Sequence, residues 1–460
     1  MKFKTVSGTV IRHNNRAFLI LILSCYCFLS DAKTVFLPKN FVDGAVVLTQ
    51  NMIMETNTTY VIKYQYDLLG ATINLPEGSI LKFCNDGKLM NGTIIGCNSS
   101  IQTIKSNVRF DNVIILGLWN VAEISSNLFR FSSDDPELNT KNFRSMCMLT
   151  SDEHVGVLHI SNGIYNIKLD SKNECCFNLN SNTELIIDGA IILEGNQLEN
   201  YQILQIKKKG NVKVHGSGIL VGDVETHLGK TGEWGMGIAI LDSDNIEIRD
   251  LTIKNCWGDC IYIGQVGYDK SSYSQNVLID NIICQSGRRQ GMSIISGKDI
   301  YVTNSQFIDT GSIKFTAPGA GIDIEPNILG NTVVDNIVIE HCEFYGNTNG
   351  RDFLTYNLDS TANVALRNSK LEGHFYLGKG SYNIVIDSCE LNSVLTPQEN
   401  YGNIRIKNSV ITTKTKVDRC VIIENCEFGE VKLSTNGIWM LPCALVLTIG
   451  VFGIRKYNRS

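Results

Sequence analysis

The chain has 460 residues, of which 43% are hydrophobic and 19% are charged, and it contains 40 glycines against 7 prolines. This balance is typical of a globular protein with a large core and many turns, and it excludes a largely disordered chain. The net charge of −5, with no long basic run, gives no electrostatic footprint for nucleic acid, so no nucleic-acid partner is expected.

Residues 1–32 have the pattern of an export signal. Basic residues between Lys2 and Arg16 precede the apolar run AFLILILSCYCFLS, which ends near small residues suited to cleavage. A retained signal anchor is the alternative, but the run is short for a bilayer span. Residues 22–25 also resemble a bacterial lipoprotein cleavage box, in which Cys25 would carry the lipid.

Residues 436–460 predict a transmembrane anchor with a basic tail. The uncharged run at 438–454 is followed directly by Arg455 and Lys456. As a helix this run would reach about 26 Å, enough for a thin bilayer, with the basic pair on the cytoplasmic side. The body would then be exported and membrane-anchored, in the periplasm or at the cell surface. A buried terminal strand is the alternative.

Between these ends, one short phrase recurs with loops of variable length. Each unit has a polar first residue, alternating apolar positions, a polar corner and a second apolar run, which predicts two brief strands separated by a bend. Such units bury their apolar faces only by stacking, so the repeats predict a parallel β-solenoid. Leucine-rich and propeller repeats do not fit, because their signature residues are absent. Examples are NVKVHGSGI at Asn211, NIEIRDLTI at Asn245, NVLIDNIIC at Asn276 and NIVIDSCEL at Asn383.

The expected organisation follows the repeats. Residues 33–75 are expected to form an N-terminal cap and first coil, beginning near residue 45, and residues 76–435 the β-helix. The interval 120–152 breaks the rhythm. There, acidic and serine residues at 133–135 predict the cap of a short helix through KNFRSMCML that shields an edge of the coil.

The cysteines favour a structural role. Three of them occupy the same place in the repeat as serines do in other units, which suits small free thiols in an inward slot. Disulfides between stacked slots are the alternative, and no paired CxxC spacing predicts a metal site. The equivalent positions are Cys342, Cys389, Cys426, Ser305, Ser369 and Ser409.

The stretch GVLHISNGIYNI, followed by the repeats, resembles the right-handed parallel β-helix superfamily of pectate lyases and polygalacturonases. It also resembles uncharacterised bacterial β-helix proteins with the same central block. The resemblance covers residues from about 45 to 435 and implies an all-β, right-handed parallel β-helix.

Three consecutive units align into a candidate site. The segments are WGDCIYIG from Trp257, RRQGMSIIS from Arg288 and GAGIDIEPN from Gly319. They align in register when Asp259 is placed beside Gln290. Tyr262, Ser293 and Asp323 then form the next row, and Glu325 and Asn327 extend it. Because side chains alternate along a strand, Asp323 and Glu325 are expected to face solvent while the neighbouring isoleucines face the core.

WGDCIYIG resembles the polygalacturonase segment in which two aspartates precede a cysteine. Asp259 matches the second aspartate, but Gly258 stands in place of the first, the general acid, and Gln290 replaces a histidine. An inverting hydrolase needs an acid and a base about 6.5–9.5 Å apart, so Asp323 or Glu325 would have to supply one partner.

A lyase reading uses other groups. Arg288 or Arg289 would remove a proton beside a uronic carboxylate, with Lys314 as a second donor. Asp259, Asp323 and Glu325 would in that case gather Ca²⁺ through their hard oxygens. The residues leave both chemistries open.

The long loop GDVETHLGKTGEWGMGI at 222–238 is expected to fold over the site. Trp234 would stack on a sugar, and His227 is either a proton carrier or a solvated loop residue. Trp257 is either a sugar platform or a core ring.

Two functions are therefore predicted: an exported hydrolase or lyase acting on an acidic polysaccharide, or a non-catalytic glycan-binding or surface-structural β-helix. For the first, the catalytic candidates are Asp259, Asp323, Glu325, Arg288 and Arg289. The substrate-binding candidates are Gln290, Tyr262, Trp257, Trp234, His227, Lys314 and Asn327.

Overall fold

The computed structural model describes residues 33–102, 107–171, 174–267, 271–326, 332–396, 401–413 and 421–429. The expected export signal at 1–32, the expected anchor at 436–460 and Asn327 lie outside these ranges. Within the described ranges, no helix has the length and apolar character needed to span a membrane.

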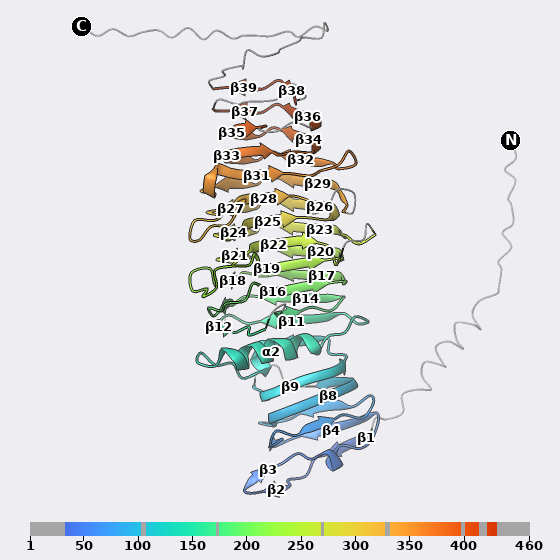
Figure 1. The fold of residues 1–460 in the computed structure, drawn as a ribbon. Coiled ribbons are helices and arrows are strands. Elements are labelled where there is room, and N and C mark those ends of the chain that lie inside the picture. The colour runs from blue at the N-terminus through green and yellow to red at the C-terminus, as the bar shows by residue number, and fades with distance from the viewer. Residues whose placement is uncertain are drawn as a thin grey trace, which may run out of the picture.

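The described chain is a stack of coils whose strands pair in parallel with those of the coils before and after (Figure 1). This confirms the expected parallel β-helix. A sheet near the N-terminus opens the stack, and two long sheets continue it. A short antiparallel hairpin, β2 (Phe41–Val42) with β3 (Ala45–Val46), lies at the N-terminal end.

The first sheet has seven strands, and its parallel pairing begins with β1 and β4. A 3-10 helix, η1 (Gln50–Met52), precedes β4. The strands are β1 (Lys33–Phe36), β4 (Thr58–Ile62), β5 (Gln65–Asp67), β6 (Thr72–Asn74), β7 (Ile80–Phe83), β8 (Lys88–Gln102) and β9 (Phe110–Trp119).

The second sheet runs through twelve coils in sequence order. Its strands carry the first half of each repeated phrase. They are β10 (Glu123–Ser125), β11 (Gly156–Ile160), β14 (Thr183–Ile187), β17 (Gly210–His215), β20 (Asp244–Arg249), β23 (Ser274–Asp280), β26 (Gly297–Thr303), β29 (Val334–Glu340), β32 (Val364–Arg367), β34 (Ser381–Asp387), β36 (Tyr401–Lys407) and β38 (Val421–Glu424).

The third sheet has eighteen strands because most coils contribute two of them. The first row is β12 (Ile164–Ile167), β15 (Ala190–Leu193), β18 (Ile219–Val221), β21 (Thr252–Lys254), β24 (Ile283–Gln285), β27 (Gln306–Ile308), β30 (Glu343–Tyr345), β33 (Lys370–Leu377), β35 (Glu390–Leu395), β37 (Val410–Ile411) and β39 (Glu427–Phe428). The second row is β13 (Glu174–Asn178), β16 (Asn200–Lys207), β19 (Trp234–Leu241), β22 (Asp259–Gly264), β25 (Gln290–Ile294), β28 (Ala320–Ile324) and β31 (Arg351–Thr355).

The polar residues that open and close each phrase have a conformational cause. Asn245 opens its unit with φ 57°, and Asp250 turns the corner with φ 60°. Asn and Asp enter this left-handed region more readily than other residues with a side chain, because their short polar groups bond locally. The amides also form ladders between coils, as where Asn245 Nδ2 donates to Asn211 Oδ1 at 2.7 Å.

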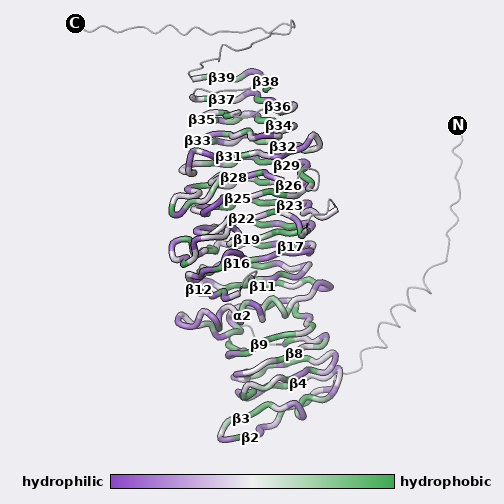
Figure 2. Tube along the Cα trace, viewed as in Figure 1, coloured by the Kyte–Doolittle hydropathy of each residue, from purple (hydrophilic) through white to green (hydrophobic). Residues whose placement is uncertain are grey.

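The recurring serine and cysteine slot faces inward, as expected. The Ser369 hydroxyl accepts the backbone N–H of Cys342 in the coil before it at 3.1 Å, and Ser409 does the same for Cys389. The cysteines of the described chain are free thiols, so the disulfide alternative is wrong for them. Figure 2 shows hydrophobic residues recurring through the strands of the stack.

The α-helix of the described chain interrupts the coils where the sequence predicted it. Helix α2 (Pro136–Met148) begins after Asp135, whose side chain accepts the N–H of Leu138 at 2.9 Å. The helix follows a 3-10 turn, η2 (Ser126–Leu128), and lies between β9 and β11 in Figure 1. Phe143 packs against Phe177 of β13, so the helix covers the N-terminal end of the third sheet. A further 3-10 turn, η3 (Thr348–Gly350), precedes β31.

Candidate active site

Strands β22, β25 and β28 bring the three aligned segments side by side. Asp259 pairs with Gln290, which pairs with Ala320 in the next coil. Tyr262, Ser293 and Asp323 form the second row in the expected register. The alignment made from the sequence therefore matches the structure.

The expectation that the acids face solvent is wrong for Asp323, whose exposed fraction is 0%. Asp259 also has no exposed surface, and only Glu325 is partly exposed. Alternation itself holds on β28, since Ile322 and Ile324 belong to the core and Asp323 lies on the opposite face of the strand. Asp323 is buried because side chains of the neighbouring coil, Gln290 among them, cover that face. The two aspartates are therefore buried polar groups whose hydrogen-bond partners matter.

Asp259 is held by a cation and a hydroxyl. Its Oδ2 accepts from Arg289 Nη1 at 3.1 Å and from the Ser293 hydroxyl at 2.7 Å. Burial raises the pKa of Asp259 to about 6, although the charge of Arg289 opposes that rise. At neutral pH the carboxyl is therefore mainly ionised, and it titrates close to neutrality.

Among the residues that the structure describes, Asp323 has no cationic partner within hydrogen-bonding distance. Its Oδ2 accepts from Gln290 Nε2 at 2.6 Å, and Gln290 is in turn oriented by the N–H of Ala320, which its Oε1 accepts at 2.8 Å. Burial, and then the nearby carboxylate of Glu325, raise the pKa of Asp323 well above its usual range. The protonated form of Asp323 is therefore favoured more strongly than that of an ordinary aspartate.

Arg289 connects the aspartates to the neighbouring loop. Its Nε lies 3.5 Å from Glu233 Oε2, and its side chain is 14% exposed. Although burial opposes the charge of Arg289, nearby carboxylates, first that of Asp259 and also that of Glu233, raise its pKa. A guanidinium held in this way is a poor proton acceptor, which argues against its predicted role as a lyase base.

Among the described residues, some buried polar atoms of this cluster have no hydrogen-bond partner. They are Oδ1 of Asp259, Oδ1 of Asp323 and Nε of Arg289. Buried polar groups are nearly always hydrogen-bonded to protein, water or a ligand. The unused capacity of both carboxyl groups is thus available to another molecule.

The loop before Trp234 is locked down rather than solvated. The ring of His227 is buried and stacks on Trp257, with their ring centroids 3.7 Å apart. His227 Nδ1 bonds to Asp223 Oδ2 at 2.8 Å, and Asp223 also accepts the hydroxyl of Tyr201. His227, Trp257, Asp223 and Tyr201 therefore form a buried cluster, the clamp, that holds the loop in place. The alternative of a solvated His227 is wrong.

Trp257 was predicted to be either a sugar platform or a core ring. The structure shows that it is a core ring. The guanidinium carbon of Arg288 lies 3.7 Å from its ring centroid on a cation–π contact. Arg288 also donates to the carbonyl oxygen of Gly232 at 2.8 Å, and burial lowers the pKa of Arg288. Lys314 donates to the carbonyl oxygen of His227 at 3.1 Å. Arg288 and Lys314 therefore anchor loops beside the site.

The clamp explains the glycine at the position of the missing acid. A Cβ at Gly258 would lie 2.3 Å from the carbonyl oxygen of Glu233, so no side chain fits there. The loop at 222–233 fills the space that a first aspartate would need. The departure from the polygalacturonase pattern is therefore built into the packing.

The remaining predicted residues are distributed along the same row of strands. Trp234 is 50% exposed at the start of β19, one coil before Asp259, and Tyr262 is partly exposed on β22. Ser293 and Glu233 contact the cluster but were not among the predicted site residues. Ser293 was within reach of the sequence, because it aligned in the row of Asp323; the position of Glu233 depends on the loop.

The calcium site stays a prediction, since the described side chains form no assembled set of calcium ligands. Asp259 and Asp323 lie in different coils and direct oxygens to Arg289, Ser293 and Gln290. No group of three or more His, Cys, Asp or Glu residues in the described ranges is arranged to hold a metal ion.

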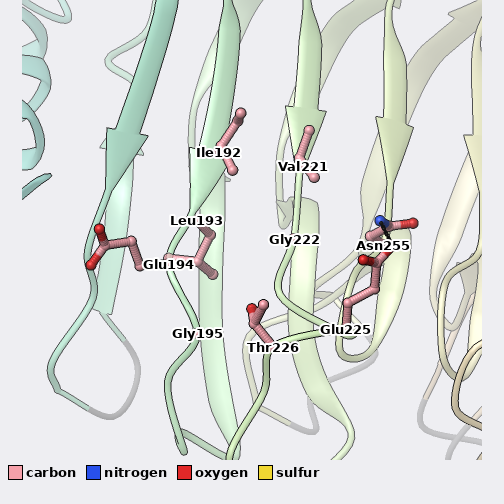
Figure 3. A pocket seen from close by; sticks show the side chains of 9 residues that line it. All are labelled: Ile192, Leu193, Glu194, Gly195, Val221, Gly222, Glu225, Thr226 and Asn255. Carbon is pink, nitrogen blue, oxygen red and sulfur yellow. Dashed lines mark hydrogen bonds between the residues drawn. The ribbon is translucent and has the colours of Figure 1, made fainter. Parts of the chain in front are cut away.

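A pocket of about 420 Å³ lies elsewhere, at the ends of β15 and β18 (Figure 3). Asn255 Nδ2 donates to Glu225 at 2.9 Å on one side of it, and Glu194 points away from Val221 and Thr226. None of the predicted site residues lines this pocket. The candidate active site is thus the buried aspartate cluster beside it in the coil, not this cavity.

Comparisons with known proteins agree with the fold. No protein-family model matches the chain. The SPbeta prophage-derived uncharacterized protein YorA of Bacillus subtilis (strain 168) is 25% identical over 289 residues, 57% of this chain and 46% of that protein. The uncharacterized protein YclG of the same strain is 28% identical over 180 residues, 36% of this chain and 31% of that protein. The chain thus spans less than half the length of these curated relatives.

Among solved structures, the chain is similar to the tailspike protein gp49 from Acinetobacter baumannii bacteriophage Fri1, a capsular polysaccharide depolymerase. The TM-score is 0.51 at 14% identity, over 66% of this chain and 58% of that one. A likeness at this identity concerns the fold alone. The architecture is the parallel β-helix that the resemblance to pectate lyases and polygalacturonases implied.

Proposed function

We propose that the protein is an exported enzyme that hydrolyses an acidic polysaccharide, with Asp323 as general acid and Asp259 as general base. The observation that carries the proposal is the difference between the two carboxyls. Burial and Glu325 favour the protonated form of Asp323, whereas Arg289 and Ser293 favour the ionised form of Asp259. Titratable groups whose environments push their pKa values apart have the properties of an acid–base pair.

In the proposed reaction, Asp323 gives its proton to the glycosidic oxygen as the bond from that oxygen to the anomeric carbon breaks. Asp259 takes a proton from the water that attacks the anomeric carbon. Asp259 and Asp323 lie two coils apart, and Asp323 is three residues further along its strand than Ala320, the residue in register with Asp259. An inverting hydrolase needs about 6.5–9.5 Å between its carboxyls, which leaves room for the attacking water. After such a reaction, exchange with solvent would restore both protonation states.

Access requires movement, because neither aspartate is exposed. Arg289 covers Asp259 and, among the described residues, contacts the loop through Glu233, whose side chain is 44% exposed. A swing of Arg289 towards an anionic sugar would expose the carboxyls and place a cation beside the substrate. The tailspike neighbour, a polysaccharide depolymerase by name, supports the choice of substrate.

The second candidate is a non-catalytic glycan-binding β-helix. The absence of exposed surface on Asp259 and Asp323 favours it, and so does the steric exclusion of an acid at Gly258. In this reading the cluster only ties the coils together. The two candidates differ in whether products appear.

The test is product release from a panel of uronic-acid polymers by the purified full-length chain. Hydrolysis gives new reducing ends, whereas a lyase gives unsaturated products that absorb ultraviolet light. We expect reducing ends alone, lost in Asp259→Asn and Asp323→Asn and kept in Glu343→Gln, a matched change of an exposed acid on β30. Unsaturated products would overturn the hydrolase, and no products from any polymer would favour the second candidate.

A further inference from the structure

The column that contains Asp259 and Gln290 continues past the aspartate cluster. Arg351 begins the strand of the next coil, two residues before Phe353, which pairs with Ile322. His374 pairs with Arg351 in the following coil. Arg351 thus lies on the same row of strands, one coil beyond Asp323.

Arg351 has no acidic partner in the described ranges. No carboxylate oxygen there lies within 4.0 Å of it, in contrast to Arg249, which contacts both Glu247 and Asp250. Its Nη1 donates to the carbonyl oxygen of Pro318 at 3.2 Å. Since a guanidinium carries five N–H donors in a planar fork, most of its capacity remains for a ligand.

The carboxyl beside it in the sequence is committed elsewhere. Asp352 is buried, and it accepts from Asn347 Nδ2 at 2.8 Å and from the N–H of Gly373 at 2.6 Å. Burial raises the pKa of Asp352 to about 6. Asp352 therefore fixes the backbone at the start of β31 without pairing with Arg351.

An aromatic ring and a histidine complete the surroundings. The guanidinium carbon of Arg351 lies 5.1 Å from the ring centroid of Tyr376, which is partly exposed in the next coil. His374 is also partly exposed, and its Nδ1 bonds to the Ser393 hydroxyl at 2.5 Å. A cation held beside an aromatic ring, with polar groups around it, suits a sugar ring that carries a carboxylate.

We propose that Arg351, with Tyr376 and His374, forms a subsite for the carboxylate of a uronic acid residue. The subsite rests on the proposed function for its place next to the point of cleavage. A glycan chain that runs along the stack would put a neighbouring sugar over Arg351, because adjacent coils are about 4.8 Å apart. The planar fork of Arg351 would bind both carboxylate oxygens, and Tyr376 would contact the ring.

The experiment measures binding, so it does not depend on turnover. Affinity electrophoresis compares the full-length chain on polyuronic acid gels and on gels of the same polymer with its carboxyls reduced to alcohols. Arg351→Gln is expected to weaken binding to the acidic polymer about 10- to 100-fold, as for a lost charge-assisted pair. Arg367→Gln, an exposed arginine on β32 of the other sheet, is the matched control and is expected to bind like the wild type.

Three results would overturn the subsite. One is equal binding by the Arg351→Gln and Arg367→Gln variants, and a second is a wild type that binds no acidic polymer. A loss of the same size on the reduced polymer would also overturn it, since the carboxylate would then play no part. Arg351→Lys, which keeps the charge but not the fork, should recover part of the affinity and shows that the site is folded.

Repeating the measurement in the Asp323→Asn background separates the two proposals. If the subsite is correct, binding still depends on Arg351 there, whether or not Asp323 is needed for cleavage. A fully active Asp323→Asn variant whose binding depends on Arg351 would reject the catalytic assignment alone. An inactive variant whose binding ignores Arg351 would reject the subsite alone.

Discussion

Asp259 Oδ2 accepts the hydroxyl of Ser293 in the next coil at 2.7 Å, and the same diagonal recurs one coil further on. There Gln290 Nε2 donates to Asp323 Oδ2 at 2.6 Å. Strand β25 therefore supplies a donor to both carboxyls. What differs is the second partner, since Asp259 also meets the charge of Arg289, and this difference separates the protonation states of the two aspartates.

Replacing Asp323 by Asn tests the protonation state directly. An amide mimics a protonated carboxyl, and its oxygen can still accept from Gln290 Nε2. We expect the free energy of unfolding at neutral pH to change by less than about 1 kcal/mol, because a neutral isostere replaces a neutral group. Activity should fall by about 10²- to 10⁴-fold with the loss of the general acid.

The pH dependence of stability provides the check on Asp323. Its folded pKa lies above the unfolded value, so the native state binds the extra proton. The stability from this group is complete below the unfolded pKa and is lost as the pH rises through the folded pKa. Thermal melts of the wild type should therefore drop as the pH rises above the unfolded pKa, more steeply than those of Asp323→Asn. Parallel curves would show that Asp323 is not protonated in the native protein.

The pKa of Asp259 predicts how kcat/KM falls at acidic pH. A general base must be ionised, and the pKa of Asp259 is about 6. Below that pH we expect kcat/KM to fall about tenfold per pH unit. Initial rates measured across mildly acidic pH would show this limb, with circular dichroism confirming that the chain stays folded. A rate that is flat well below pH 6 would remove Asp259 from the role of base.

The sequence contained enough information for the coils and their register, but not for the burial of the acids. Asn245 and Asp250 mark the corners because left-handed backbone favours those residues, and the apolar alternation does the rest. Asp323 looked solvent-facing because alternation was applied to one strand in isolation. The groups that close over the cluster, Arg289 and Gln290 from the previous coil and Glu233 from a distant loop, are set by tertiary packing.

His227 shows the same limit. A histidine in a glycine-rich loop indicates solvent exposure, and no local pattern shows that the loop returns to Trp257. The partners that bury it, Asp223 and Tyr201, lie in two different coils. Composition identified the loop, but only the fold shows where its side chains go.

If the clamp holds the loop, replacing His227 by Leu should loosen residues 222–234 and leave the distant coils unchanged. The variant loses the Nδ1 donor and leaves Asp223 with one fewer partner in a buried site. We expect a cost of about 1–3 kcal/mol, the usual penalty for an unsatisfied buried polar group. Hydrogen exchange of residues 222–234 should become faster while the distant coils keep their protection.

Leu228→Ala is the matched control for the clamp, because Leu228 is exposed on the same loop. Its exchange should stay at the wild-type rate. If His227→Leu also leaves the loop protected, the stack on Trp257 is not what holds it. If exchange rises equally in every coil, His227 stabilises the whole solenoid and not the loop.

The ladder of asparagines predicts opposite stability orders for Gly and Ala variants at two positions. At both positions the side-chain amide of the asparagine donates a hydrogen bond to the neighbouring coil. Asn245 donates to Asn211 and has φ 57°, whereas Asn363 donates to Asp335 at 2.8 Å without a left-handed φ. Gly adopts the left-handed conformation freely, but Ala pays about 1–2 kcal/mol for it. At 245 the Gly variant should therefore be more stable than the Ala variant, and at 363 the order should reverse, because Gly loses more chain entropy. Denaturant midpoints at unchanged m-values measure both pairs. If the Gly and Ala variants had the same order of stability at both positions, the hydrogen bond of the side-chain amide, and not the backbone conformation, would explain the asparagine at each of them.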